Sequence, residues 1–291
     1  VNPETKSIKV EQKIFQGFGG VADYQKNKIG LAVADAKLLQ VEQNTLLKAV
    51  DAFSGAIFAN EKYSIYQQNL NLIERQVEMD QIRLDRGQVS LADLAQSESS
   101  LAEAEAKFIQ AKNDVVTAKL NYENIIGHIS DSFELEKNII MDLKIPLSLD
   151  KAINMSKNSN PNLTISKLEF DQSQKDVLIA QSDLSPSASL SFETTETDDL
   201  STTYDQQDKE TLEAKISWPI FSGGKNYASL SKSKNLRNRK KLLYENAIKM
   251  NDTNVASAWS NLQSSKSVLE AVKLQVRAAE IANEGITAEY E

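Results

Sequence analysis

The residue types that most often carry catalytic or metal chemistry are scarce in this sequence. Its 291 residues include one histidine, His128, and no cysteine, which excludes a histidine cluster, a disulfide framework and thiol chemistry. The glycine-rich GFGG at 17–20 follows a predicted strand but lacks the spacing of a dinucleotide-binding fingerprint. We therefore predict that the protein is not an enzyme and that it binds no cofactor and no metal.

One carboxylate has a residue spacing that defines a local role. Ser90 precedes a helical pattern and Asp93 follows it three residues later, which is the spacing of a capping box. Such an aspartate also places negative charge at the positive end of the helix dipole. Directly before it, Arg86, Gly87 and Gln88 interrupt the helical pattern, so we expect the tip of a helical hairpin there. Gly87 would let another backbone approach closely.

Charge and hydropathy exclude further classes. The formal net charge of −8 argues against nucleic acid as the main partner, and the basic run 231–241 is interpreted as a solvated helix face. No stretch approaches 18 consecutive apolar residues, so no transmembrane helix is predicted. The chain starts at Val1 without a methionine and stops at Glu291 inside a helical pattern, from which we expect a piece of a longer protein.

Helical patterns fill most of the chain. No proline occurs between residues 21 and 85, which allows one helix of roughly 65 residues, or about 100 Å. Over 91–126, large residues recur every seven positions and mostly small residues follow each by three. The large residues are Leu94, Leu101, Phe108, Val115 and Tyr122. This heptad predicts two antiparallel helices that wind around each other with a left-handed supercoil, so 21–126 should form a long helical hairpin. Further helices are expected near 149–158, over 161–183 and over 225–291.

Three segments alternate between apolar and polar residues, which predicts half-buried strands. They are 5–15, 187–194 and 211–220, the last two joined by an acidic segment that we expect to be a long loop.

The two ends of the chain resemble each other. After a shift of 206 residues, IFQG at 14–17 falls on IFSG at 220–223, and AFS at 52–54 falls on AWS at 258–260. Each copy has the order strand, glycines, very long helix, which predicts an internal duplication. We expect a partial first repeat over 1–126, a linker over 127–160, and a partial second repeat over 161–291.

This order resembles the TolC family of outer-membrane efflux and type I secretion channels of Gram-negative bacteria. The landmarks are QKIFQGFGG (12–20) and ISWPIFSGG (216–224) at the strand-to-helix joins, the hairpin tip within 84–108, and SNPNLTISKLEF with the residues after it (159–192). The resemblance implies a mainly α fold with a membrane β-barrel contribution. Three protomers would give four strands each to a twelve-stranded barrel, and the helices would continue it as a tunnel; three of the four strands would be present here.

The same resemblance implies a passive exit duct in the cell outer membrane, with its helical part in the periplasm. Its partners would be two further copies of the chain, membrane lipid, and an inner-membrane transporter reached through a periplasmic adaptor. Lipid-facing residues would be Ile8, Val10, Ile14, Leu190, Phe192, Leu212, Ile216 and Trp218. Arg86, Gly87 and Gln88 would meet the adaptor, and Asp93 with Tyr290 would hold the periplasmic end shut.

Two other interpretations remain open at this point. A soluble coiled-coil scaffold would also show long heptads, and a periplasmic adaptor would have long helical hairpins. Asp93 could act as a helix cap alone. The sequence does not distinguish drugs, metals and secreted proteins as the cargo.

Overall fold

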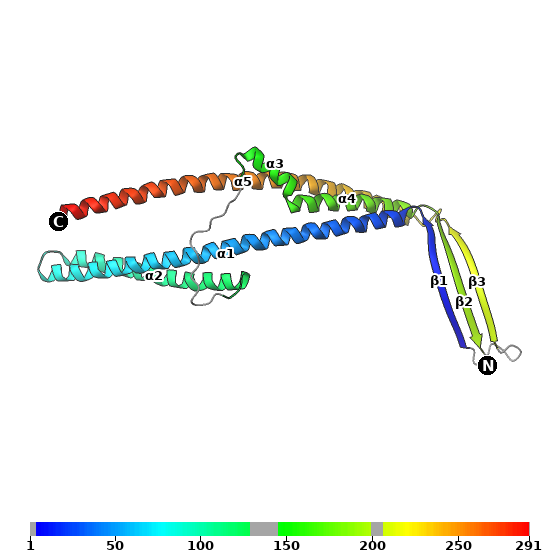
Figure 1. Ribbon diagram of the computed structural model, residues 1–291, viewed down its shortest axis with the longest axis horizontal. Coiled ribbons are helices and arrows are strands. Elements are labelled where there is room, and N and C mark those ends of the chain that lie inside the picture. The colour runs from blue at the N-terminus through cyan, green and yellow to red at the C-terminus, as the bar shows by residue number, and fades with distance from the viewer. Residues whose placement is uncertain (1–3, 129–144, 199–205, 291) are drawn as a thin grey trace. The chain divides into compact units, whose positions relative to one another are not determined.

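The computed structural model describes residues 4–128, 145–198 and 206–290, with only the backbone described for 286–290. It consists of long helices and one antiparallel sheet (Figure 1). The elements are β1 (Glu4–Gln16), α1 (Gly19–Asp85), α2 (Leu91–Ile125), α3 (Leu149–Ser159), α4 (Pro161–Ser182), β2 (Ser187–Asp198), β3 (Gln206–Ser217) and α5 (Lys225–Tyr290). The chain divides into two compact units, 40–144 and the remainder, and α1 runs through both.

The sheet has the order β1-β2-β3, and its hairpin is longer than predicted. The described parts of the acidic segment expected to be a loop are strand: β2 continues to Asp198 and β3 begins at Gln206. Threonines at 194, 195 and 197 explain this extension, since β-branched residues favour strands. At the other end β3 stops at Ser217, two residues before Pro219, which has no N–H to continue the ladder.

A β-bulge changes the register near the end of β1. Lys13 pairs with Ser189 and Phe15 pairs with Ala188, so Ile14 has no cross-strand partner. Strict alternation along β1 would put Ile14 on the apolar face. Because of the bulge, Phe15 takes this place instead, opposite Ala188.

The first strand-to-helix join lies against the turn that connects α4 to β2. Gly17 has φ +51, and a Cβ atom at this position would lie 2.5 Å from Cβ of Ser185. A Cβ atom on Gly19 would overlap the Ser182 hydroxyl. Gly17, the glycine of IFQG, therefore has to be glycine, whereas a side chain at Gly19 would require the Ser182 hydroxyl to move.

The second join contacts the same turn through two hydrogen bonds. The Trp218 Nε1–H donates a hydrogen bond to the Leu184 carbonyl over 3.2 Å, and the Asn226 amide donates to the Asp183 carbonyl over 2.9 Å. The two strand-to-helix joins therefore both contact one turn, where the sheet meets the helices.

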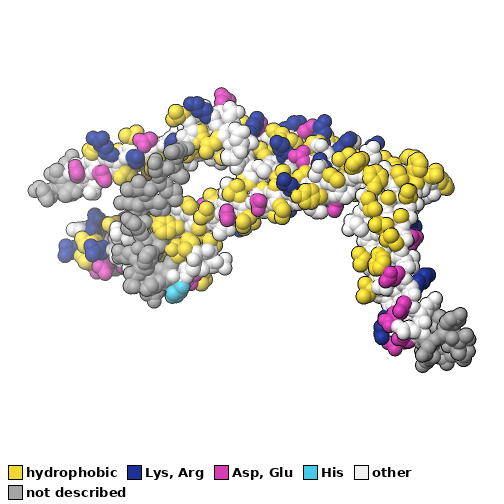
Figure 2. Space-filling model, turned by 45° about the vertical axis from the view of Figure 1, so that its right-hand side comes forward, with side chains coloured by type: hydrophobic (Ala, Val, Ile, Leu, Met, Phe, Trp, Pro, Cys, Tyr) yellow, Lys and Arg dark blue, Asp and Glu magenta, His cyan; other side chains and the backbone are white. Residues whose placement is uncertain are grey.

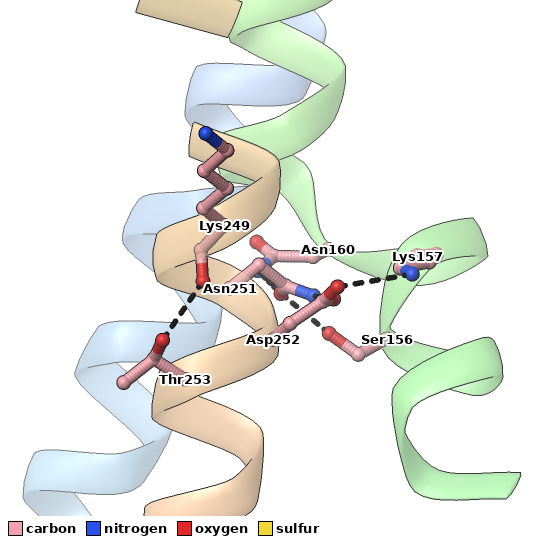
Figure 3. Close-up of polar contacts among 7 residues, drawn as sticks. All are labelled: Ser156, Lys157, Asn160, Lys249, Asn251, Asp252 and Thr253. Carbon is pink, nitrogen blue, oxygen red and sulfur yellow. Dashed lines mark hydrogen bonds and ion pairs between the residues drawn. The ribbon is translucent and has the colours of Figure 1, made fainter. Parts of the chain in front are cut away.

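A buried amide joins α3, α4 and α5 (Figure 3). Asn251 on α5 is 5% exposed, and its Oδ1 accepts hydrogen bonds from the Ser156 hydroxyl over 2.5 Å and the Asn160 amide over 2.7 Å. Beside it, the Lys157 ammonium lies 3.0 Å from the Asp252 carboxylate. Asn160 also caps α4, whose first residue is Pro161 as predicted, so one cluster fixes how three helices meet.

The α1–α2 hairpin confirms the heptad. The buried residues of α2 are Leu94, Ser97, Ala104, Ala111 and Tyr122, all from the predicted seam. The rings of Phe108 and Tyr63 lie 5.3 Å apart across it. Two polar contacts fix the register: the Ser97 hydroxyl donates to Asp80 over 2.6 Å, and the Lys62 ammonium donates to Asp114 over 2.8 Å. Asp114 holds the pKa of Lys62 above its usual value through this hydrogen bond.

Candidate functional site

The sheet has one apolar face. Residues opposite each other on neighbouring strands point to the same side. Counted from the helices, the first four rows on this side are Phe15–Ala188–Ile216, Gln12–Leu190–Ala214, Val10–Phe192–Leu212 and Ile8–Thr194–Glu210; farther out the same side carries the polar rows Lys6–Glu196–Asp208 and Glu4–Asp198–Gln206. Most side chains of the first four rows are exposed, with Ile216 at 81% and Leu212 at 70%, while Ala188 and Thr194 are half-buried. Figure 2 shows hydrophobic side chains gathered where the sheet meets the helices and along the adjoining part of the sheet.

This apolar face is as tall as a membrane. From Ile8 to Phe15 the strand spans about 23 Å at 3.3 Å per residue, while outer-membrane barrels carry an apolar band of about 25 Å. Seven of the eight residues predicted to face lipid lie in the three strands and are exposed. One of the seven is Ile14, at the bulge.

Trp218, the eighth, lies just beyond β3 in a belt of exposed apolar side chains at the strand-to-helix joins. The belt includes Phe18, Val21, Trp218, Ile220 and Phe221. Phe18 is the one described residue other than glycine with positive φ, at 62°, and its ring packs edge-on against Phe15. Aromatic residues at the edge of an apolar band are typical of a membrane–water interface. Nothing in the local pattern of the sequence indicated the backbone of Phe18.

The opposite face of the sheet is polar and charged. Its rows include Lys13–Ser189–Lys215, Glu11–Ser191–Glu213 and Lys9–Glu193–Thr211. An antiparallel sheet that is apolar on one side and charged on the other can separate a nonpolar phase from water.

The hairpin tip is closed by a helix C-cap. Gly87 has φ +72, its N–H donates to the Leu84 carbonyl, and the Gln88 N–H donates to the Arg83 carbonyl, each over 2.8 Å. These two bonds form a Schellman motif. A glycine directly after the end of a helical pattern is a sequence signal for such a C-cap. The sequence prediction treated Gly87 only as part of a docking surface and did not use this signal. Arg86, Gly87 and Gln88 are exposed at the tip.

The predicted cap at Asp93 is confirmed. Its Oδ2 accepts hydrogen bonds from the Ser90 N–H over 2.8 Å and the Ser90 hydroxyl over 2.7 Å, and its own N–H donates to the Ser90 hydroxyl oxygen over 3.3 Å. The hydrogen bond from the Ser90 backbone, followed by that from its side chain, lowers the pKa of Asp93 below its usual value of 3.8. The side chain of Tyr290 lies outside the described residues, so the pairing of these two residues stays a prediction.

Two long helices expose apolar residues at helical spacing. On α1, Phe58, Ile65, Leu72 and Met79 recur every seven residues, and each is more than half exposed. They form a stripe separate from the seam that faces α2. Toward its C-terminal end α5 exposes Leu269, Val272 and Val276 at seam spacing, together with Val268, Leu274 and Ile281.

Residues suited to chemistry do not converge. The single histidine, His128, is exposed just beyond α2, with Nδ1 3.1 Å from the Glu123 carboxylate. Within the part of the chain that the structure describes, no group of three or more His, Cys, Asp or Glu side chains could hold a metal ion. Among the same residues, no helix has both the length and the hydrophobicity to cross a membrane.

Comparison with known proteins gives matches along nearly the whole chain. Residues 4–128 and 152–291 match the family model for outer membrane efflux proteins. The outer membrane efflux protein BepC of Brucella suis is 25% identical over 287 residues, which are 98% of this chain and 62% of BepC. The alkaline protease secretion protein AprF of Pseudomonas aeruginosa is 19% identical over 278 residues, or 94% of this chain and 58% of AprF. The chain thus spans about three fifths of these curated relatives.

Solved structures show the same fold. The outer membrane channel MtrE of Neisseria gonorrhoeae, in its open state, superposes with a TM-score of 0.75 at 16% identity. The match covers 99% of this chain and 70% of MtrE.

Proposed function

Because the chain belongs to the outer membrane efflux protein family, we propose that it forms the wall of a passive channel through which substrates leave the cell. The family match confirms the predicted resemblance and the location in the outer membrane. The matched proteins are named as efflux, secretion and channel proteins, so the proposed role is transport and not catalysis. The soluble coiled-coil scaffold and the periplasmic adaptor are less favoured alternatives, since neither accounts for a sheet whose apolar face is exposed.

The two-faced sheet is the observation that carries this proposal. A three-stranded sheet leaves the outer edges of β1 and β3 unpaired, and its apolar face is exposed. In lipid an unpaired edge is costly, because no water satisfies its N–H and C=O groups. Closure into a barrel removes the edges, turns the apolar face to lipid and the charged face to a lumen. Three copies of four strands each would give the twelve-stranded barrel that the resemblance implies.

The exposed stripes of the helices support a tunnel built from several copies. The α1 stripe at Phe58, Ile65, Leu72 and Met79 would be covered by a helix of another hairpin. A helix with two apolar seams packs against a neighbour on each side, as a closed ring of helices requires.

The stripe on α5 supports the proposed duplication. After the shift of 206 residues, Leu269 and Val276 fall on Tyr63 and Leu70 of α1. Tyr63 packs against Phe108 of α2, so α5 carries apolar residues where its proposed counterpart meets a partner helix. We therefore retain the repeats over 1–126 and 161–291, with 127–160 as the linker between them.

Fractionation and channel recording test the channel. Full-length protein is expected in the outer membrane as a trimer that resists carbonate extraction, and purified trimers are expected to conduct ions in planar bilayers. A scaffold or adaptor would instead be released by carbonate and would not conduct.

The hairpin tip is proposed to dock a periplasmic adaptor, which links the channel to an inner-membrane transporter. Gln88→Trp is a cleaner probe than a substitution of Gly87, whose positive φ would strain any other side chain. Export is expected to fall in Gln88→Trp while the trimer and its membrane insertion persist. Normal export would place docking elsewhere.

Asp93 and Tyr290 are proposed to keep the periplasmic end closed. Because Asp93 also caps α2, the Tyr290→Phe variant is the selective test: it removes one hydroxyl and leaves the cap intact. We expect more frequent opening in planar bilayers. If Tyr290→Phe conducts like wild type, Asp93 serves only as a cap.

A further inference from the structure

The charges on the polar face of the sheet are sorted by sign into two adjacent rows. The rows are Lys13–Ser189–Lys215, here called the basic row, and Glu11–Ser191–Glu213, the acidic row. They lie two residues apart along each strand, about 7 Å. The basic row is the nearer to the helices, because β1 ends at Gln16 and α1 begins at Gly19.

These charges are not neutralised by their neighbours. Among the described residues, none of the four charged side chains in the two rows makes an ion pair. In the next row, by contrast, the Lys9 ammonium lies 3.8 Å from the Glu193 carboxylate. The middle strand carries only serine in both rows, and Ser191 is 9% exposed. Each row is therefore a pair of like charges separated by a small neutral residue.

We infer that the basic and acidic rows are two successive electrostatic selectivity bands, which act on charged groups of the passing cargo. The inference rests on the proposed function, since it needs the charged face of the sheet to line a lumen. With two charges per protomer in each row, a trimer would carry six positive charges in one band and six negative charges in the next. Anionic groups would be favoured at the end of the barrel nearest the helices, and cationic groups one step farther out.

The expected size of the effect is measurable. At about 10 Å in water a single charge alters the local concentration of a monovalent ion roughly twofold at low salt. Several like charges in one band multiply this factor, and 1 M salt, with a screening length of about 3 Å, removes most of it.

Single cysteines can report the potential at each band, because the 291 residues contain no other cysteine. Ser189→Cys places a thiol in the basic row and Ser191→Cys places one in the acidic row. Each full-length variant, in outer-membrane vesicles, is treated with an anionic and a cationic methanethiosulfonate reagent. The ratio of the two rates cancels differences in the thiolate fraction. We expect the anionic reagent to be favoured at 189 and the cationic one at 191, with the two ratios differing by roughly fivefold or more at low salt.

Matched variants assign the effect to the rows. Adding Lys13→Gln and Lys215→Gln to Ser189→Cys is expected to abolish its preference for the anionic reagent. Lys9→Gln, which removes a lysine already paired with Glu193, is expected to change it little. If the ratios at 189 and 191 are equal, or survive neutralisation of the lysines, the inference is overturned.

A cysteine on the apolar face separates this inference from the proposed function. Phe192→Cys is expected to react slowly in membranes because lipid covers it. Equal accessibility at 189 and 192 would overturn the channel itself. Protection at 192 with reaction at 189 but no charge preference would overturn the two bands alone.

Discussion

At the scale of single residues, Asp93 links helix capping to pH. Its folded-state pKa lies below 3.8, so the charged carboxylate stabilises the hairpin at neutral pH. That stabilisation is lost as the pH falls from 3.8 through the lower folded-state value. Asp93→Asn should therefore lower the melting temperature at neutral pH, and its difference from wild type should shrink on acidification.

Glu98→Gln is the matched control, since it removes an exposed carboxylate from the same helix outside the cap. A similar loss in both variants at neutral pH would show that general charge, and not the cap, is responsible.

Gly87 gives a second residue-scale prediction. At φ +72 an alanine is strained by roughly 1–2 kcal/mol, whereas asparagine enters this region more readily. No atom lies near the missing Cβ, so backbone conformation alone decides the outcome. Thermal melts should rank wild type above Gly87→Asn and Gly87→Asn above Gly87→Ala. Equal stability of the two variants would contradict the assignment of a left-handed cap.

Local sequence pattern predicts some of these features and not others. The Ser90–Asp93 cap and the seam around Ala111 followed from spacing, because both depend on neighbours within a few helical turns. The bulge at Ile14 and the backbone of Phe18 did not, since each depends on what the other strands and turns impose. The length of the β2–β3 hairpin was also missed, because acidic residues suggested a loop where cross-strand pairing with threonines continues the ladder.

At the scale of elements, Asn251 determines how α3 and α4 meet α5. Asn251→Ala would leave the Ser156 hydroxyl and the Asn160 amide without their buried acceptor. The expected loss is about 1–3 kcal/mol, measured as a lower unfolding midpoint. Asn246→Ala on the same helix is the control, because Asn246 is exposed and donates only to the Met250 sulfur. Equal effects of the two substitutions would mean that the cluster adds nothing beyond helix propensity.

At the scale of the whole molecule, the exposed stripe of α1 allows the folding of one chain to be tested separately from the assembly of several chains. Leu72 is 64% exposed in a single chain and lies away from the seam that holds α2. Leu72→Glu should therefore leave the α1–α2 hairpin folded, with helical content unchanged by circular dichroism. In a proposed ring of helices the same glutamate would be desolvated at a contact between neighbours, which is costly for an unpaired charge. Trimers of this variant should dissociate on native gels at lower temperature than those of wild type.

Gln67→Glu introduces the same charge at an exposed position of α1 that lies outside both the seam facing α2 and the exposed stripe. This variant should leave the trimers intact. If Leu72→Glu assembles as stably as Gln67→Glu, the stripe is not a contact between helices, and the tunnel must be held together by the sheet and by the seams already buried in each chain. If both variants weaken the trimer equally, added negative charge is the cause. Only loss confined to Leu72→Glu supports a wall in which every long helix has a neighbour on each side.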